Sequence, residues 1–321
     1  MSTLRLTLPR VAPHEVVLAA ILAVTLAILA AFTDRFLTVD NLLNQGRLMT
    51  EVGLIALPMT LVIITGGIDL SVGSTLGLCA IMLGYSWQNW HFPLPLAIAF
   101  AILLGAACGA VNGWFITRMR VPPLIMTLST LALYRGLAEG ISQAHSVRGY
   151  PDWFYAVGQY NAWGVPSQLW IMLVAIVVFW VALSRTTFGR ALYAMGHNEV
   201  AARFSAIPVA RIKLLIYTAS GMMAGLAAFI FVSRVSTTRS DMGTGIELDV
   251  IAAVVLGGTS IFGGTGTIAG TVLGLALIQL LKNGLALTGV KGDATIVVIG
   301  TVLIASILIT DFAQRRRERG R

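Results

Sequence analysis

The sequence predicts an all-α polytopic membrane protein, and its composition is the first observation that indicates this class. Of its 321 residues, 57% are hydrophobic and 11% are charged, whereas a soluble domain carries about 25% charged residues. The hydrophobic residues also gather into runs close to the length that crosses a hydrocarbon layer of about 30 Å. Because a helix satisfies its own backbone hydrogen bonds in lipid, we expect each run to be a helix.

The hydrophobic runs predict about ten transmembrane helices. The first run, Val16 to Phe32, follows Arg5 and Arg10 in the manner of a secretory signal, but it is long for a signal core and no small-residue cleavage site follows it. We therefore expect a retained span. The other nine runs are Val52 to Thr65, Leu70 to Trp87, Leu94 to Thr117, Pro122 to Ile141, Leu169 to Leu183, Leu214 to Ser233, Val250 to Phe262, Thr267 to Leu281 and Ala294 to Thr310.

Several of the shorter runs lie beside glycine pairs. These pairs are Gly66-Gly67, Gly257-Gly258 and Gly263-Gly264. Irregular backbone at membrane depth is tolerated where it is buried in protein or lines a watery cavity. The pairs therefore predict broken or re-entrant helices.

The basic residues predict that both termini are cytoplasmic, because loops rich in Lys and Arg stay on that side. With ten spans, the inner segments hold 14 of the 22 basic residues. These are Arg5, Arg10, Arg118, Arg120, Arg185, Arg190, Arg203, Arg211, Lys213, Arg315, Arg316, Arg317, Arg319 and Arg321. The net charge of +8 is thus explained without a nucleic-acid partner. The expected organisation is a cytoplasmic segment 1–15, one transmembrane domain 16–310 with an inner loop 184–213, and a basic cytoplasmic tail 311–321 in a multi-pass protein of the cell (inner) membrane.

No pattern in the sequence is typical of an enzyme. A nucleotide-binding loop of the form G-x-x-x-x-G-K-[ST] is missing, and Gly264-Thr265-Gly266 has the wrong spacing for a dinucleotide site. The four histidines have no zinc-ligand spacing, and Cys79 and Cys108 lie in hydrophobic runs. We expect no catalytic residue, no metal and no cofactor.

Ionisable residues within the runs are sparse. Asp69 is the clearest, with Arg135 and Lys282 near span ends. Carriers driven by protons or sodium usually place such groups inside their spans. The pattern favours a transport subunit that is driven by a partner, and a stand-alone secondary sugar carrier is the alternative.

Four polar residues in or beside the runs have two interpretations each. Asp69 follows a glycine break and precedes a helix, so it can be an N-cap or a solute contact. Asn112, Gln279 and Asn283 can hydrogen-bond between helices or line a solute path.

The inner loop contains the pattern of a short docking helix. Gly196-His197-Asn198 is a turn signal, Asn198 is a suitable N-cap, and Pro208 ends the segment. The helix from Glu199 to Ser205 combines the small residues Ala201 and Ala202 with the aromatic Phe204. A docking surface for a cytoplasmic partner explains this combination better than a solvated connector does.

From about Leu42 to Asp311 the chain resembles the permease subunits of ATP-binding-cassette sugar importers of the ribose, rhamnose and autoinducer-2 group. The most specific strings run from Ile64 to Ser74, from Gly189 to Ile207 and from Gly243 to Ser260. The chain departs from the family at His197, where Gly is usual, and at Ala206 and Pro208, where Gly and Asn are common. The strings from Ala206 to Pro208 and from Arg239 to Gly243 lean toward the autoinducer-2 and rhamnose branches.

The resemblance implies an import path for a small sugar or sugar-like solute, with three kinds of partner. These are an ATP-binding-cassette ATPase subunit, a second permease copy or paralogue, and a periplasmic or lipid-anchored sugar-binding protein. The implied coupling residues are Asn198, Glu199, Ala201, Ala202, Arg203, Phe204 and Ser205. The candidates for the path or its gate are Gly66, Gly67, Asp69, Ser71, Asn112, Glu247, Asp249, Thr259, Ser260, Gln279 and Asn283.

Overall fold

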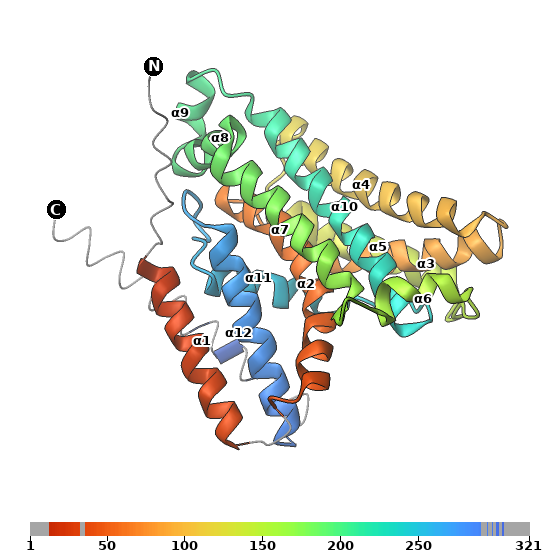
Figure 1. Cartoon of the computed structure of the whole chain (residues 1–321). Coiled ribbons are helices and arrows are strands. Elements are labelled where there is room, and N and C mark those ends of the chain that lie inside the picture. Colours follow the sequence, from red (N-terminus) through yellow and green to blue (C-terminus); the bar gives the residue numbers. More distant parts are fainter. Residues whose placement is uncertain are drawn as a thin grey trace, which may run out of the picture.

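The computed structural model describes residues 13–32 and 36–289, with the single positions 294, 297, 300, 301 and 304. Residues 1–12, the tail 311–321 and, apart from those positions, the last predicted span lie outside the described residues. Over the described ranges the chain forms twelve α-helices and one two-stranded hairpin (Figure 1). The helices are α1 Pro13–Phe32, α2 Val39–Ile64, α3 Val72–Gln88, α4 Leu94–Arg118, α5 Pro123–Ser142, α6 Asp152–Gln159, α7 Ser167–Arg185, α8 Thr187–His197, α9 Glu199–Phe204, α10 Val209–Val235, α11 Ile246–Leu256 and α12 Ile268–Leu287; the strands are β1 Asn161–Ala162 and β2 Val165–Pro166.

Six of the described helices are long and hydrophobic enough to cross a membrane: α1, α2, α4, α7, α10 and α12. Helix α11 has 11 residues, so at about 1.5 Å per residue it crosses only part of a bilayer. The predicted all-α polytopic class is confirmed at this level. A total of ten spans with both termini cytoplasmic stays a prediction.

The helices break at the predicted glycine pairs. Helix α2 ends at Ile64, where Gly66 adopts a φ of +75° and its N–H donates to the Ile63 carbonyl at 2.8 Å. Between α11 and α12 the glycines with positive φ are Gly258, Gly263, Gly264 and Gly266. Only glycine adopts this left-handed backbone at little cost, which explains the residue type at both breaks.

Helix α2 begins at Val39, thirteen residues before the predicted Val52. The side chain of Thr38 caps it by accepting from the N–H of Asn41 at 3.4 Å. The predicted start was wrong because the first half of the helix carries polar residues, including Arg47 and Glu51. A hydropathy window rejects such a stretch although it lies in the bundle.

Small residues allow the two long helices α4 and α10 to cross closely. A side chain at Gly109 would collide with the Tyr217 carbonyl, and one at Gly221 would collide with the Gly105 carbonyl. In lipid such close backbone approach replaces the hydrophobic effect as a source of helix association.

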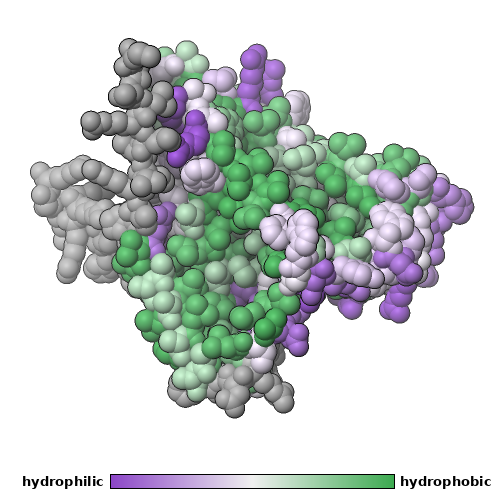
Figure 2. Space-filling view, in the orientation of Figure 1, coloured by the Kyte–Doolittle hydropathy of each residue, from purple (hydrophilic) through white to green (hydrophobic). Residues whose placement is uncertain are grey.

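The outer surface is extensively hydrophobic. Figure 2 shows a broad hydrophobic surface over α1, α7 and α12, with hydrophilic residues near the α9 end and near the α6 end of the molecule. On α1 the side chains of Val16, Val17, Val24 and Ile28 are at least half exposed. A soluble monomer does not expose so large a hydrophobic area, so this surface fits lipid as the solvent.

Candidate functional site

A cavity of about 580 Å³ lies between α2, α10, α11 and α12. Its hydrophobic wall includes Phe231 of α10 and Ile246 of α11. Its polar wall comes from α2 and α12: Asn41, Asn44, Gln45, Glu51, Gln279, Lys282 and Asn283. The structure thus places the predicted path candidates Gln279 and Asn283 together, with further polar residues that sequence analysis missed.

Pairs of amide side chains join the polar faces of α2 and α12. The side-chain N–H of Asn41 donates to Asn283 at 3.0 Å, and Asn283 donates back at 2.9 Å. One step further along, Gln279 donates to Gln45 at 2.8 Å. Both helices present these residues at a spacing of four, so they lie on one face of each helix. The same amides bridge the two helices and line the cavity. That they lie on a solute path stays a prediction.

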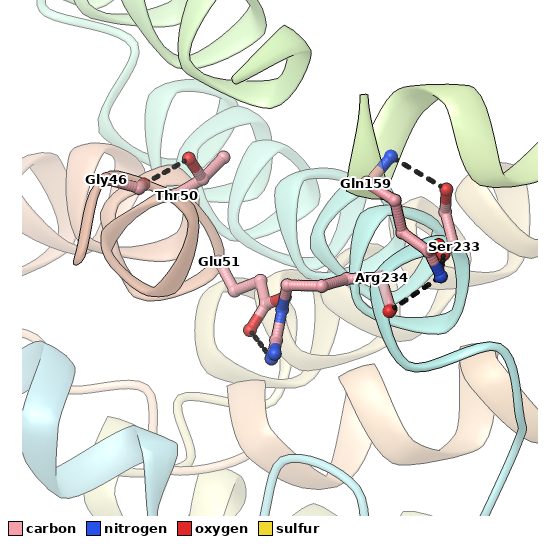
Figure 3. Close-up of polar contacts among 7 residues, drawn as sticks. Gly46, Thr50, Glu51, Gln159, Ser233 and Arg234 are labelled. Atoms are coloured by element: carbon pink, nitrogen blue, oxygen red, sulfur yellow. Dashed lines mark hydrogen bonds and ion pairs between the residues drawn. The ribbon is translucent and has the colours of Figure 1, made fainter. Parts of the chain in front are cut away.

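A buried ion pair stands beside this cavity. The guanidinium of Arg234, at the end of α10, donates to the two carboxylate oxygens of Glu51 at 2.7 and 3.0 Å (Figure 3). The Glu51 side chain is only 5% exposed. The hydroxyl of the adjacent Thr50 donates to the Gly46 carbonyl within α2 at 3.1 Å. It therefore does not compete with Arg234 for the Glu51 carboxylate.

Helix α6 and the hairpin make further hydrogen bonds close to the Glu51–Arg234 pair. Gln159 donates from its side chain to the Arg234 carbonyl at 3.1 Å and to the Ser236 hydroxyl at 2.8 Å. Arg47 of α2 donates to the Asn161 side chain of the hairpin at 2.7 Å. Helices α2, α6 and α10 are thereby fixed to one another near the cavity.

A second ion pair joins α11 and α12, where Lys282 donates to Asp249 at 2.5 Å. Lys282 and Asp249 were identified in the sequence, but Glu51 and Arg234 were not, so the set of charged residues expected in or beside the spans was incomplete. Glu51 and Arg234 were missed because both lie at the edges of hydrophobic runs, and in the structure α2 and α10 extend past them. The sequence carries a periodic signal for Glu51 alone, since Asn41, Asn44, Gln45 and Glu51 recur at helical spacing.

Asp69 lies in a separate buried network, away from the residues that line the cavity. Its carboxylate accepts from the Ser71 N–H at 3.0 Å, from the Ser71 hydroxyl at 2.7 Å and from the Ser220 hydroxyl at 2.9 Å. Asn112 donates in turn to the Ser71 hydroxyl at 2.9 Å. The N-cap of α3 is Ser71 rather than Asp69. The N-cap interpretation was wrong by two residues, although the carboxylate does receive a free N–H at the helix start.

The two glycine breaks meet at a junction with α8. The N–H of Gly264 donates to the Ile64 carbonyl at 2.9 Å, and the Tyr193 hydroxyl of α8 donates to the Gly266 carbonyl at 2.7 Å. A side chain at Gly196 would collide with the backbone of both Ile64 and Gly264. Helix α8 is therefore in direct contact with both breaks.

The other path candidates near the breaks line no part of the cavity. Thr259 and Ser260 are buried beside the Gly263–Gly266 turn, where the Ser260 N–H donates to the Thr265 carbonyl at 3.1 Å. Glu247 lies against Gly73 of α3. Gly66 and Gly67 form the break itself.

The segment that the sequence predicts to be a short docking helix, Glu199 to Ser205, folds as the six-residue helix α9, which ends at Phe204. Asn198 caps it by accepting from the Ala201 N–H at 3.0 Å. Glu199 pairs with Arg203 and with Lys213, each at 2.6 Å. Partial burial favours the neutral carboxyl, but the hydrogen bonds from Lys213 and Arg203 outweigh it and lower the pKa of Glu199. These pairs therefore stabilise α9 at neutral pH, and that contribution is lost as pH falls through the lowered pKa.

The side chains of α9 divide into an outward and an inward set. Phe204 is 89% exposed, and Val200 is 63% exposed. Ala201, Arg203 and Ser205 are also exposed, but Ala202 is buried in the chain's own core. The expectation that Ala202 lies at a partner contact was wrong, because one helix face must pack on the bundle and position 202 is on that face.

Known proteins similar to this chain are permeases. The family described as the branched-chain amino acid transport system permease component matches residues 39–307. The autoinducer 2 import system permease protein LsrD of Yersinia enterocolitica is 37% identical over 319 residues, covering 94% of this chain and 96% of the relative. Proteins of the same name from Escherichia coli (strain K12) and Shigella flexneri are each 37% identical over 310 residues, covering 95% of this chain and 94% of the relative. No solved structure matches the chain.

Proposed function

The chain belongs to the family of branched-chain amino acid transport system permease components, and from that premise we propose that it forms the membrane path for a small sugar-like solute in an ATP-driven importer. As a permease it is a transport subunit of the membrane and not an enzyme. The relatives that cover nearly its whole length are named for import of autoinducer 2. Autoinducer 2 is therefore the first solute to test.

The observation that carries this proposal is the cavity between α2 and α12. Its volume of about 580 Å³ is in the range of cavities that enclose small ligands. Five amide side chains line it, and amides both donate and accept hydrogen bonds. Hydroxyl groups of a sugar-like solute can exchange hydrogen bonds with such a wall as the solute passes.

The partners and topology extend the proposal. The exposed Phe204 and Val200 on α9 support docking of α9 on an ATPase subunit, since buried aromatic anchors dominate protein contacts. With α9 placed in the cytoplasm, the proposal keeps the ten spans and the cytoplasmic termini that the sequence predicts. A second permease copy or paralogue and a sugar-binding protein complete the importer.

Uptake of labelled autoinducer 2 tests this function. Cells that lack an importer for this solute receive the chain with its ATPase and binding-protein partners, and labelled leucine serves as the competing substrate class. We expect uptake of autoinducer 2 that disappears when the ATPase cannot hydrolyse ATP. Uptake of leucine but not of autoinducer 2 by the assembled complex would overturn the proposed solute.

A further inference from the structure

Two charged residues face the cavity, and each is paired with a residue behind the wall. Glu51 and Lys282 are among the residues that line it, whereas their partners Arg234 and Asp249 are not. Among the described lining residues these two carry the only formal charges. The cavity therefore has one anionic and one cationic group, and each is neutralised from outside the path.

The geometry of both ion pairs supports this arrangement, in which one charged residue lines the cavity and its partner does not. Arg234 holds Glu51 through two parallel hydrogen bonds, which is the strongest arrangement for a guanidinium and a carboxylate (Figure 3). Gln159 of α6 fixes the backbone of Arg234 from the opposite side. Asp249 approaches Lys282 from α11, the helix that closes the neighbouring wall.

We propose that Arg234 and Asp249 are specificity-determining residues that keep the cavity electrically neutral and so select uncharged polar solutes. They are positioning residues, because they act on the solute through Glu51 and Lys282. An unpaired carboxylate in the wall would attract cations and repel anions, and an unpaired ammonium would do the reverse. For the class of solute, this proposal rests on the proposed function, but the charge balance itself can be measured without any solute.

The test is the reactivity of a cysteine placed in the cavity. Asn44 lines the cavity and is exposed, so Asn44→Cys offers an accessible thiol, while Cys79 and Cys108 are buried. In the assembled complex, its reaction rate is measured with cationic trimethylammonioethyl methanethiosulfonate and with anionic sulfonatoethyl methanethiosulfonate. The parent protein without Asn44→Cys gives the background. The cationic rate is divided by the anionic rate, and this ratio is compared with the same ratio for a small free thiol in solution. The difference reports the local electrostatic potential in the cavity.

We expect opposite shifts from the two single changes. Arg234→Gln leaves Glu51 unpaired and raises the ratio of cationic to anionic rates roughly tenfold, the scale of an uncompensated charge in a partly screened cavity. Asp249→Asn leaves Lys282 unpaired and lowers the ratio by a similar factor. Adding the second neutral change in each pair, Glu51→Gln or Lys282→Gln, returns the ratio to the wild-type value.

A merely structural role would lower both rates or the amount of protein without changing their ratio. If Arg234→Gln fails to assemble, the more exposed pair of Lys282 and Asp249 provides the test. The proposal would be overturned if the ratio of cationic to anionic rates were the same in Asp249→Asn as in Asp249→Asn combined with Lys282→Gln. Failure of the wild-type complex to import autoinducer 2 would count against the proposed function alone. The rate ratios would still test the charge balance of the cavity independently.

Discussion

At the scale of single residues, Asp69 shows how a buried carboxylate is held without a charged partner among its contacts. It is 1% exposed and receives three hydrogen bonds from Ser71 and Ser220. A buried polar group is stable only when such donors are supplied. The network joins the α2–α3 break to α10 directly and to α4 through Asn112.

Replacement of Asp69 separates a structural role from a transport role. Asp69→Asn keeps an oxygen for Ser71 and offers an N–H to the Ser220 hydroxyl, so we expect near-normal folding and transport. Asp69→Leu removes the acceptor of three buried donors, the Ser71 N–H and the hydroxyls of Ser71 and Ser220. At about 1 to 3 kcal/mol for each donor, it should lower stability by at least about 3 kcal/mol. Thermal unfolding of the purified complex measures this. Normal folding of both variants with no transport would place Asp69 in the solute path.

Gly196 is a residue of α8 that lies against the backbone of both glycine breaks. In Gly196→Ala the added methyl collides with backbone atoms of Ile64 and Gly264, which cannot rotate away. Overpacking of this kind costs about 1 to 3 kcal/mol. We expect the ATPase subunit to co-purify while solute-stimulated ATP hydrolysis is lost.

Gly136→Ala is the matched control for that change, because a side chain at Gly136 meets no atom within 4 Å. It should bind the ATPase and respond to solute as the wild type does. Equal solute stimulation in Gly136→Ala and Gly196→Ala would show that the junction does not transmit movement.

At the scale of elements, two substitutions in α9 distinguish a role in partner docking from a role in folding. Phe204→Ala removes an exposed anchor, so we expect normal abundance in the membrane with about 30-fold weaker ATPase binding, equivalent to a loss of roughly 2 kcal/mol. Ala202→Arg forces a long cation into the chain's own core and should lower abundance. Co-purification and immunoblotting measure the two effects. Normal abundance of Ala202→Arg with lost ATPase binding would return Ala202 to the docking face.

Helices α2 and α12 show how far sequence reasoning reaches for an element. Gln279 and Asn283 were identified as polar residues in or beside a hydrophobic run, and both line the cavity. Asn41, Gln45 and Glu51 were missed, because hydropathy averages over a window and conceals a polar stripe on one face. Helical periodicity from Asn41 to Glu51 would have revealed that stripe, but not its partners on α12.

At the scale of the whole molecule, the proposed topology places α9 and the hairpin on opposite sides of the membrane. Phe204 is 89% exposed, and Trp163 is 90% exposed. Phe204→Cys should therefore react with a membrane-impermeant thiol reagent only in inside-out vesicles, and Trp163→Cys only in intact spheroplasts. Because Cys79 and Cys108 are buried, the parent gives a low background. Reaction of both positions from the same side would contradict the ten-span arrangement.

The sequence by itself determined the features that depend on composition and on short-range patterns. These include the all-α membrane class, the breaks at the glycine pairs and the Asn198 cap of α9, and strings within the chain carried the resemblance to permeases. Tertiary structure alone decided which polar residues meet. Glu51 and Arg234 are 183 positions apart, and Asn41 and Asn283 are 242 positions apart. Such pairs depend on how helices pack, and the same packing turns Ala202 inward and Phe204 outward on a helix whose sequence alone does not say which face the bundle will cover.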